Sequence, residues 1–309
     1  MSKVNPKIDL VFKKLFGSEE NKDILLSLIN AILPIDRQIA KITLKNPYNV
    51  SDYAEGKLSI LDIKAEDENG RLFDIEMQIR SSKFYGKRAL FYWAKMFGSQ
   101  LDYVLEDSQD SDSNTEIGYS DLKKCIVISL MDFNFFDDKE YHRFYTLKDG
   151  KTHEQHKELD YLDLYFIELK KYKGKLQNLN TTLERWITFL NNAHKYDNKT
   201  LPKALAEIRE IRKASQKLDT MYLDEKEKGY YDAQQKFWLD QNAFMKEAIE
   251  KAQADGKEKG KVEGKAEGEL NSKIEIAKSL FQTSLSNDDI AKHTNLTLEK
   301  VQQLRHEKE

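Results

Sequence analysis

The sequence predicts an α/β fold in which a mixed α and β part is followed by a helical part. Short runs rich in β-branched, aromatic and leucine residues, typical of strands, occur between about residues 42 and 169. Apolar residues at helical spacing precede and interrupt these runs. From Leu183 onward the pattern is almost wholly helical, and it includes a long stretch of alternating charges over 203–251, which is typical of the solvated side of a long helix.

Two helices and three strands are predicted at the beginning. Asn5 and Pro6 provide a capping residue and a first-turn proline for a helix that ends near Gly17. A second apolar helix over 23–33 stops at Pro34. The strand patterns that follow cover residues 42–44, 58–64 and 72–79.

A further helix and three more strands complete the predicted mixed part. Residues 84–104 lack proline and have the apolar spacing of a helix packed over a sheet. The acidic, serine-rich segment 107–116 is predicted to be a solvated loop. Strand patterns return at 125–133, 142–147 and 161–169. The single cysteine, Cys125, lies in the first of these strands, so we expect a core residue and neither an internal disulfide nor a thiol nucleophile.

Composition and charge limit the classes of function. The 309 residues include 15 Phe, 15 Tyr and 3 Trp, enough for one sizeable core and a second, smaller unit. The longest apolar stretch, 125–131, is far too short to cross a membrane, and residues 1–17 do not resemble a secretory signal, so we expect a cytoplasmic protein. The net charge of −3 excludes a bulk positive field for non-specific DNA binding. It is compatible with a metal-dependent enzyme, whose site is built from carboxylates.

The stretch 59–80 carries the candidate chemistry. Asp62 is inserted into an apolar strand pattern, and Glu76 and Gln78 alternate with apolar residues in the next strand. Because side chains alternate between the two faces of a strand, Glu76 and Gln78 share one face. One face of this hairpin is therefore polar.

The register of the hairpin decides whether Asp62 joins that face. A two-residue Asn69-Gly70 turn would place Asp62 opposite Met77, on the other face. A three-residue loop over 68–70, with the glycine in the left-handed conformation, would place Asp62 opposite Glu76. We predict the three-residue loop.

Two carboxylates that face each other are stabilised by a bound cation. Their repulsion raises a pKa in a partly desolvated cleft unless a positive charge lies between them. Mg²⁺ accepts one or two carboxylates and keeps several waters, which leaves room for a phosphate oxygen. The alternative is that Asp62 and Glu76 pair with Lys64, Lys57 or Arg71 on a solvated face of an edge hairpin.

The pattern D-x13-E-x-Q across a hairpin, preceded by a helix reading DLVFKKLFGS, resembles the PD-(D/E)XK nuclease superfamily. More narrowly it resembles the Rpn-type recombination-promoting nucleases, or PD-(D/E)XK nuclease family transposases. The likeness runs from about Asn5 to Trp186 and includes KRALFYWAKMFGSQL, LYFIELKKY and LERWITFL. It implies a restriction-endonuclease-like mixed β-sheet core flanked by helices, and a hydrolase that cleaves phosphodiester bonds in DNA.

The resemblance also implies roles for individual residues. Asp62 and Glu76 would hold the metal, and Gln78 occupies the position that lysine fills in most of the superfamily. Asp9 matches an acidic residue of the family's opening motif and is a further candidate for the same cleft. The alternative for Asp9 is an i, i+4 pair with Lys13.

The glutamine has a chemical consequence. An amide can orient a water or contact a phosphate, but it supplies no charge and does not titrate, so the metal has to supply more of the activation. We expect Mg²⁺, with Mn²⁺ or Ca²⁺ as further candidates. Lys64, on the same predicted face as Asp62, is a candidate substitute charge. Its alternative is a cross-strand pair with Asp74.

The chain is predicted to divide into a nuclease-like core over 1–180, a helical extension over 181–254, a hinge over 255–270 and a small helical module over 271–309. The hinge is inferred from the four glycines spaced four residues apart from Gly256 to Gly268. Each glycine costs an isolated helix about 1 kcal/mol relative to alanine. The alternative is a glycine stripe that lets two helices approach closely in a homodimer.

The last module resembles a helix-turn-helix. Ala291, Asn295 and Val301 fall at the spacing of that motif, with asparagine where the turn favours a left-handed residue. Residues 241–309 carry 12 Lys+Arg and 13 Asp+Glu, however, so no basic footprint is present, and a protein-interaction or dimerisation module is the alternative. The residues that the second helix would present to a DNA groove are Thr297, Lys300, Gln302 and Arg305.

Two functional hypotheses follow. The first is a metal-dependent DNA endonuclease of the recombination-promoting or transposase-associated type. The second is a catalytically inactive DNA- or protein-binding module that keeps the nuclease fold. The intact set of Asp62, Glu76 and Gln78 favours the first, because retained site chemistry says more about activity than fold does.

Overall fold

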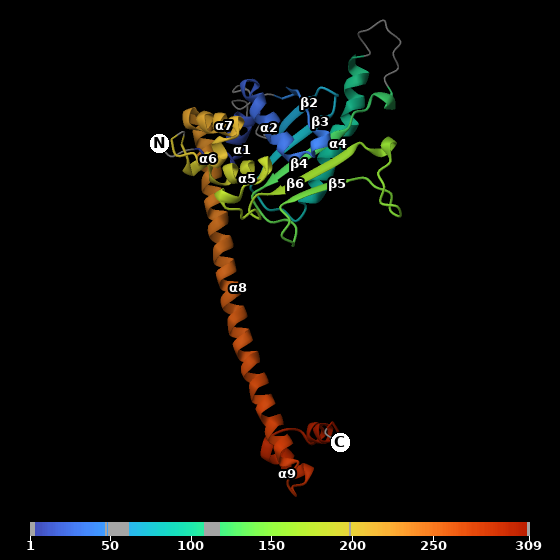
Figure 1. Ribbon diagram of the computed structural model, residues 1–309, viewed down its shortest axis with the longest axis vertical. Coiled ribbons are helices and arrows are strands. Elements are labelled where there is room, and N and C mark those ends of the chain that lie inside the picture. The colour runs from blue at the N-terminus through green and yellow to red at the C-terminus, as the bar shows by residue number, and fades with distance from the viewer. Residues whose placement is uncertain (1–3, 47, 49–61, 108–117, 198, 308–309) are drawn as a thin grey trace. The chain divides into compact units, whose positions relative to one another are not determined.

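The computed structural model describes residues 4–46, 48, 62–107, 118–197 and 199–307 (Figure 1). The chain forms two compact units, Met1–Lys236 and Phe237–Glu309. Part of the strand predicted over 58–64, Lys57 and nearly all of the loop predicted over 107–116 lie outside the described residues.

The first unit contains all the strands of the described residues and most of the helices. Most strand predictions agree with the structure to within one or two residues. The elements of the first unit, in chain order, are α1 (Asp9–Phe16), α2 (Lys22–Ile32), β1 (Ile42–Leu44), β2 (Ile63–Asp67), β3 (Leu72–Gln78), α4 (Tyr85–Asp107), β4 (Cys125–Met131), β5 (His142–Thr146), β6 (Leu162–Glu168), α5 (Thr182–Asn192), α6 (Lys203–Ala206) and α7 (Arg209–Thr220). Helix α8 (Glu225–Leu280) begins in the first unit and continues into the second, which also contains α9 (Asn287–Thr294) and α10 (Leu298–His306).

Six strands form one mixed sheet in the order β1-β2-β3-β4-β6-β5. The central pairs β3–β4 and β4–β6 are parallel, and the outer pairs β1–β2, β2–β3 and β5–β6 are antiparallel. Every residue of β4 is buried. A continuous apolar run such as CIVISLM is what a strand covered on both faces requires. The predicted α/β class with a mixed sheet and flanking helices is confirmed.

Helices cover both faces of this sheet. On one face, Ile75 of β3 and Ile128 of β4 belong to a large core that also contains Leu28 of α2 and Trp186 of α5. On the other face, Val127 and Phe166 pack with the α4 side chains of Tyr85 and Ala89, among others. Because neighbours along a strand alternate, the odd-numbered residues of β3 enter the large core and the even-numbered ones lie on the face that α4 partly covers.

Local signals explain several helix boundaries. Thr181 and Glu184 form a capping box at the start of α5, in which Thr181 Oγ1 accepts from the Glu184 amide at 3.1 Å and the Glu184 carboxylate accepts from the Thr181 amide at 3.0 Å. The start predicted for the first helix was wrong by three or four residues. Asn5 instead closes a turn, because its carbonyl accepts from the Ile8 amide at 3.1 Å, and α1 begins one residue later.

The β2–β3 hairpin has the predicted three-residue loop. The Asp67 amide donates to the Arg71 carbonyl at 3.1 Å, and Gly70 has a φ of 78°. The Asp67 side chain fixes this loop, because its Oδ1 accepts from the amides of Asn69 at 2.9 Å and Arg71 at 2.8 Å. The resulting register pairs Ile63 with Ile75 and so aligns Asp62 with Glu76, as predicted.

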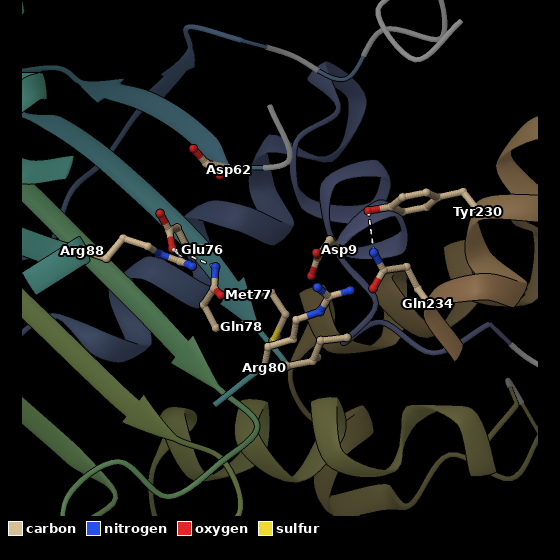
Figure 2. Close-up of a pocket in the computed structure, with 10 residues that line it drawn as sticks. Asp9, Asp62, Glu76, Met77, Gln78, Arg80, Arg88, Tyr230 and Gln234 are labelled. Carbon is tan, nitrogen blue, oxygen red and sulfur yellow. Dashed lines mark hydrogen bonds and ion pairs between the residues drawn. The ribbon is translucent and has the colours of Figure 1, made fainter. Parts of the chain in front are cut away.

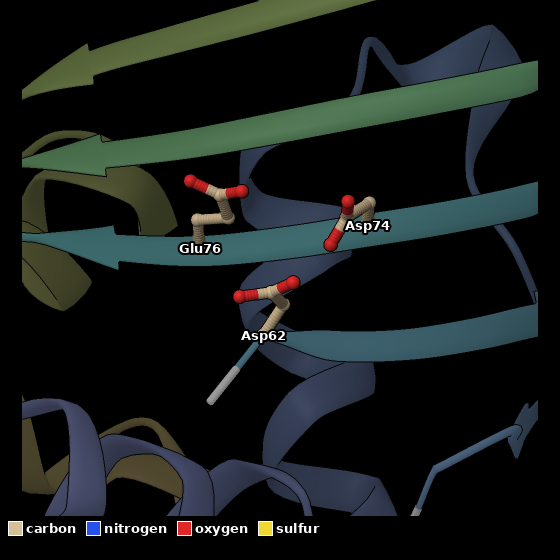
Figure 3. A group of neighbouring side chains, drawn as sticks. All are labelled: Asp62, Asp74 and Glu76. Carbon is tan, nitrogen blue, oxygen red and sulfur yellow. The ribbon is translucent and has the colours of Figure 1, made fainter. Parts of the chain in front are cut away.

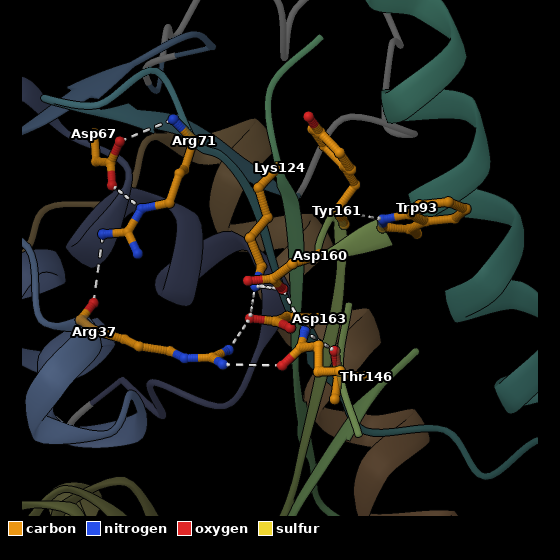
Figure 4. Close-up of polar contacts among 10 residues, drawn as sticks. Arg37, Asp67, Arg71, Trp93, Lys124, Thr146, Asp160, Tyr161 and Asp163 are labelled. Carbon is orange, nitrogen blue, oxygen red and sulfur yellow. Dashed lines mark hydrogen bonds and ion pairs between the residues drawn. The ribbon is translucent and has the colours of Figure 1, made fainter. Parts of the chain in front are cut away.

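A buried polar network anchors the same hairpin to the rest of the sheet (Figure 4). Asp163 of β6 is 1% exposed and forms ion pairs with Arg37 and Lys124, both at 2.9 Å. Arg71 binds the Asp67 carboxylate at 2.5 Å and also donates to the Arg37 carbonyl at 3.4 Å. The hairpin loop is thereby tied to a segment that is itself held by β6.

The helical part differs in two respects from the pattern expected from the sequence. The stretch 203–251 is divided among α6, α7 and the beginning of α8, and the segment 255–270, predicted to be a hinge, lies inside α8. A glycine inside a helix makes extension of the helix less favourable, but the more costly step of helix nucleation has already occurred elsewhere in α8. The flanking lysine, glutamate and alanine residues favour the helix. The division between the compact units falls after Lys236, and the four-segment scheme stays a prediction.

The second unit ends in the helix pair that the sequence predicted. Ala277, Ile290 and Val301 form the small core between the end of α8, α9 and α10. Asn295, between α9 and α10, has a φ of 56°, the left-handed conformation expected at that turn. Among the helices of the described residues, none combines the length and apolar character needed to cross a membrane.

Candidate metal and active site

Three carboxylates meet on the α4 face of the β2–β3 hairpin (Figure 3). Asp74 and Glu76 belong to β3, and Asp62 directly precedes β2. One ligand atom from each lies within 4.8 Å of the others. Asp74 and Glu76 are only 3% and 2% exposed. The sequence prediction brought Asp62 and Glu76 together but missed Asp74, which it interpreted as a partner of Lys64.

The hydrogen bonds of this cluster leave acceptors unused. Glu76 Oε2 accepts from Gln78 Nε2 at 2.9 Å and from Tyr85 Oη and Arg88 Nη2, both at 3.3 Å. Glu76 Oε1 and Asp74 Oδ1 are buried and have no hydrogen-bond partner among the described residues. A buried carboxylate oxygen without a donor is unfavourable, and a hard cation bound by both oxygens would satisfy them.

Burial and mutual repulsion govern the titration of the cluster. Burial raises the pKa of Asp74 to about 8, and the charges of Asp62 and Glu76 add to the effect. Burial likewise raises the pKa of Glu76 to about 7, with the charge of Asp62 adding and that of Arg88 opposing. The pKa of Asp62 is also raised by burial, against the nearby lysine charges. A cation would therefore compete with protons for this site at neutral pH.

Two of the three carboxylates, Asp62 and Glu76, line a cavity of about 310 Å³ at the end of β3 (Figure 2). The cavity joins acidic groups with two arginines and with two polar side chains from the first turns of α8. Its polar lining consists of Asp9, Asp62, Glu76, Gln78, Arg80, Arg88, Tyr230 and Gln234.

Asp9 lies on this cavity, as the sequence suggested. Burial raises its pKa to about 6, and the charge of Arg80 opposes that rise while the charge of Asp62 adds to it. The alternative partner, Lys13, donates to the backbone carbonyls of Asn46 at 2.6 Å and Asp62 at 2.7 Å. Lys13 thus supports the strand end that carries Asp62.

The two positively charged side chains considered for the site, Lys64 and Arg88, occupy different positions. Lys64 is exposed, pairs in register with Asp74 and does not line the cavity. Arg88 of α4 does line it and reaches the Glu76 carboxylate. Sequence reasoning missed Arg88, although an arginine between Tyr85 and Tyr92 on the sheet-facing side of an aromatic helix is a usable signal.

The residues predicted to contact DNA lie in the second unit. Thr297 Oγ1 accepts from the Lys300 amide at 3.3 Å and so caps α10. The Arg305 guanidinium lies 5.0 Å from the centre of the Phe281 ring, and Gln302 is exposed. Two of the four residues therefore make contacts that stabilise the unit itself, and the DNA-contact role of all four stays a prediction.

A protein-family model described as "PD-(D/E)XK nuclease family transposase" matches residues 6–248. The chain belongs to this family. The match covers the whole sheet and every residue that lines the cavity, and it ends before the terminal helix pair. Comparisons with curated proteins and with solved structures gave no match.

Membership of the PD-(D/E)XK nuclease family transposases supports a nuclease-type function. Nucleases of this superfamily typically use divalent metal ions, and the cluster of Asp62, Asp74 and Glu76 is an oxygen-rich donor set suited to such an ion. The homodimer predicted from the glycine stripe is not supported by the comparisons and stays a prediction.

Proposed function

We propose that this protein is a divalent-metal-dependent endonuclease that hydrolyses phosphodiester bonds in DNA. The observation that carries the proposal is the set of three carboxylates within 4.8 Å of one another, two of them with buried oxygens that no described residue binds. The family supports the nuclease chemistry, and the arginines on the cavity supply positive charge for a phosphate.

In this proposal Asp62, Asp74 and Glu76 hold Mg²⁺, with Mn²⁺ or Ca²⁺ as alternatives. A bound divalent ion lowers the pKa of a water and neutralises charge that develops on the phosphate. Asp74 extends the pair of ligands predicted from the sequence. Glu76 has one oxygen held by Gln78, Tyr85 and Arg88, which leaves the other oxygen free to face the ion.

The other cavity residues have separate roles in the proposed reaction. Gln78 is oriented by its hydrogen bond to Glu76, so its amide oxygen can accept from the attacking water. Arg88 and Arg80 bind the phosphate that is being cleaved. Asp9, with a pKa of about 6, is mostly ionised at pH 7.5 and can accept the proton that the attacking water releases.

The test is a plasmid-nicking assay in EDTA and in Mg²⁺, Mn²⁺ or Ca²⁺. We expect cleavage by the wild-type protein only with a metal, and loss of cleavage in Asp62→Ala, with folding checked by circular dichroism. The matched control is Glu66→Gln, since Glu66 is a carboxylate of β2 that pairs with Lys45 outside the cluster. Retained cleavage by folded Asp62→Ala rejects the assignment. A folded wild-type protein that cuts with none of the metals supports the inactive binding module.

A further inference from the structure

The outer side of α4 and the turn before it exposes phenylalanines among lysines. Phe84 and Phe91 are 67% and 62% exposed, and Lys83, Lys87 and Lys95 are exposed as well. We call these five residues the α4 strip. Positions 84, 87, 91 and 95 follow helical spacing and so share one side of the helix. Exposed apolar side chains that gather on one side of a helix are candidates for an interaction surface.

The local charge of this segment is the reverse of that of the whole chain. Residues 80–101 contain Arg80, Lys83, Lys87, Arg88 and Lys95 but no aspartate or glutamate, whereas the whole chain has a net charge of −3. A segment with five positive charges and no negative ones attracts an anionic partner. A two-fold contact between copies of this chain would instead bring the strip lysines against one another, which disfavours a second copy as the partner.

The strip belongs to the same stretch of chain as two arginines that line the cavity. Arg80 precedes it, and Arg88, which lies next to Lys87 in the chain, lines the cavity and contacts Glu76 at 3.3 Å. The Arg88 guanidinium also lies 5.5 Å from the centre of the Tyr92 ring of the same helix. The strip and an arginine that contacts the carboxylate cluster are therefore carried by one helix.

We propose that the α4 strip binds a single-stranded segment of DNA next to the phosphodiester that is cut. The inference rests on the proposed nuclease function and names its substrate class, DNA with an unpaired stretch at the cleavage site. Unpaired bases stack on the exposed Phe84 and Phe91 rings, and the strip lysines, of which Lys87 Nζ lies 5.8 Å from the centre of the Phe84 ring, neutralise phosphates. Bases inside a duplex are already stacked on one another and do not offer their faces to these rings.

The spacing of the two rings fits one strand. Phe84 and Phe91 are seven residues apart, which corresponds to roughly 10 Å along a helix at about 1.5 Å per residue. Bases on one strand of B-DNA are about 3.4 Å apart along the axis, so the rings can engage bases a few nucleotides from each other.

The test measures binding in EDTA, where no cleavage occurs, by fluorescence anisotropy of a labelled single strand and of its matched duplex. For the double variant Phe84→Ala, Phe91→Ala we expect the affinity for the single strand to fall about tenfold for each ring that is removed. A tenfold loss corresponds to about 1.4 kcal/mol, which is within the range measured for stacking of one base on one aromatic side chain. Duplex affinity should change less than about twofold. The matched control is Phe244→Ala, a phenylalanine of α8 that is 66% exposed.

Changing the three strip lysines to glutamine should weaken both kinds of DNA and flatten the salt dependence. Unchanged single-strand binding by the double phenylalanine variant overturns the inference, and so does an equal loss for the duplex. Sedimentation that shows a wild-type dimer and a monomeric double variant also overturns it, since the strip would then join two copies.

The same measurements separate this inference from the proposed function. If the wild-type protein cuts plasmid with metal, but the double phenylalanine variant binds single strands as tightly as the wild type, only the role of the α4 strip is refuted. A wild-type protein that binds single strands through the strip, but cuts nothing with any metal, refutes only the nuclease.

Discussion

Replacing Asp74 by asparagine is expected to stabilise the metal-free protein at alkaline pH. Asp74 is 3% exposed, its Oδ1 has no hydrogen-bond partner among the described residues, and two other carboxylates lie within 4.8 Å. These surroundings raise its pKa from 3.8 to about 8. Asparagine has nearly the same shape and no charge, so it removes the repulsion without leaving a cavity.

The sign follows from proton binding in the two states. Between about pH 4 and pH 8 the folded protein holds the Asp74 proton and the unfolded chain does not, so the wild-type protein loses stability as pH rises through this window and is flat above it. One pKa unit corresponds to about 1.4 kcal/mol, so a shift of about four units sets an upper limit near 6 kcal/mol. Glu76 contributes part of the repulsion, so only part of this limit belongs to Asp74 itself. We therefore expect Asp74→Asn to raise the free energy of unfolding by about 3 kcal/mol at pH 8.

The assay is thermal unfolding in EDTA at pH 4.5 and pH 8. A gain of about 3 kcal/mol raises the Tm of a unit of this size by roughly 6–12 °C at pH 8, and the difference should fall below about 1 kcal/mol at pH 4.5. Asp36→Asn is the matched control, since Asp36 is an exposed aspartate outside the carboxylate cluster. Adding Mn²⁺ should stabilise the wild-type protein more than Asp74→Asn. A lower Tm for Asp74→Asn at pH 8 in EDTA refutes the electrostatic reasoning.

Other parts of the molecule allow three further predictions. Mg²⁺ or Mn²⁺ affinity should rise about tenfold to a hundredfold per pH unit between pH 6 and 7, because the ion displaces protons from Glu76 and Asp74, whose pKa values are about 7 and about 8. Calorimetry in two buffers measures that proton release, and a pH-independent affinity contradicts it. Gly260→Ala should raise the stability of α8 by about 1 kcal/mol, because a Cβ atom at this position would meet no other atom within 4 Å. Melting followed by circular dichroism measures the change, and a loss of stability would contradict the prediction by revealing a packed neighbour. Asn295→Ala should destabilise the terminal helix pair by about 1 kcal/mol and Asn295→Gly much less, because φ is 56°; equal melting of the two variants argues against this.

The hairpin shows what the sequence could predict about the site. Strand periodicity located β2 and β3, and the choice of a three-residue loop gave the register that aligns Asp62 with Glu76. The loop choice is physical, because the Asp67 side chain accepts from two backbone amides of the turn and stabilises the left-handed Gly70. Local sequence signals were therefore sufficient to predict the register of this hairpin.

Asp74 and Arg88 show where sequence reasoning stopped. Asp74 has Lys64 directly across the hairpin, and a sequence does not reveal whether that lysine turns to the carboxylate or to solvent; the structure leaves Lys64 exposed. Arg88, Tyr230 and Gln234 reach the cavity through the packing of α4 and α8, which no local spacing specifies. Tertiary packing, rather than local propensity, assembles that part of the site.

The position of Arg88 bears on Gln78, which the resemblance to the superfamily motif places where most members have a lysine. Gln78 brings no positive charge to β3, yet Glu76 still has a cationic neighbour, because α4 places Arg88 at 3.3 Å from it. The ion pair and the Gln78 amide both engage Glu76 Oε2, so Oε1 keeps its lone pairs for a cation. The charge that a lysine would carry on the strand is thus supplied by the neighbouring helix. Arg88→Ala should therefore impair cleavage more than Lys64→Ala, and the reverse order in the nicking assay would return Lys64 to that role.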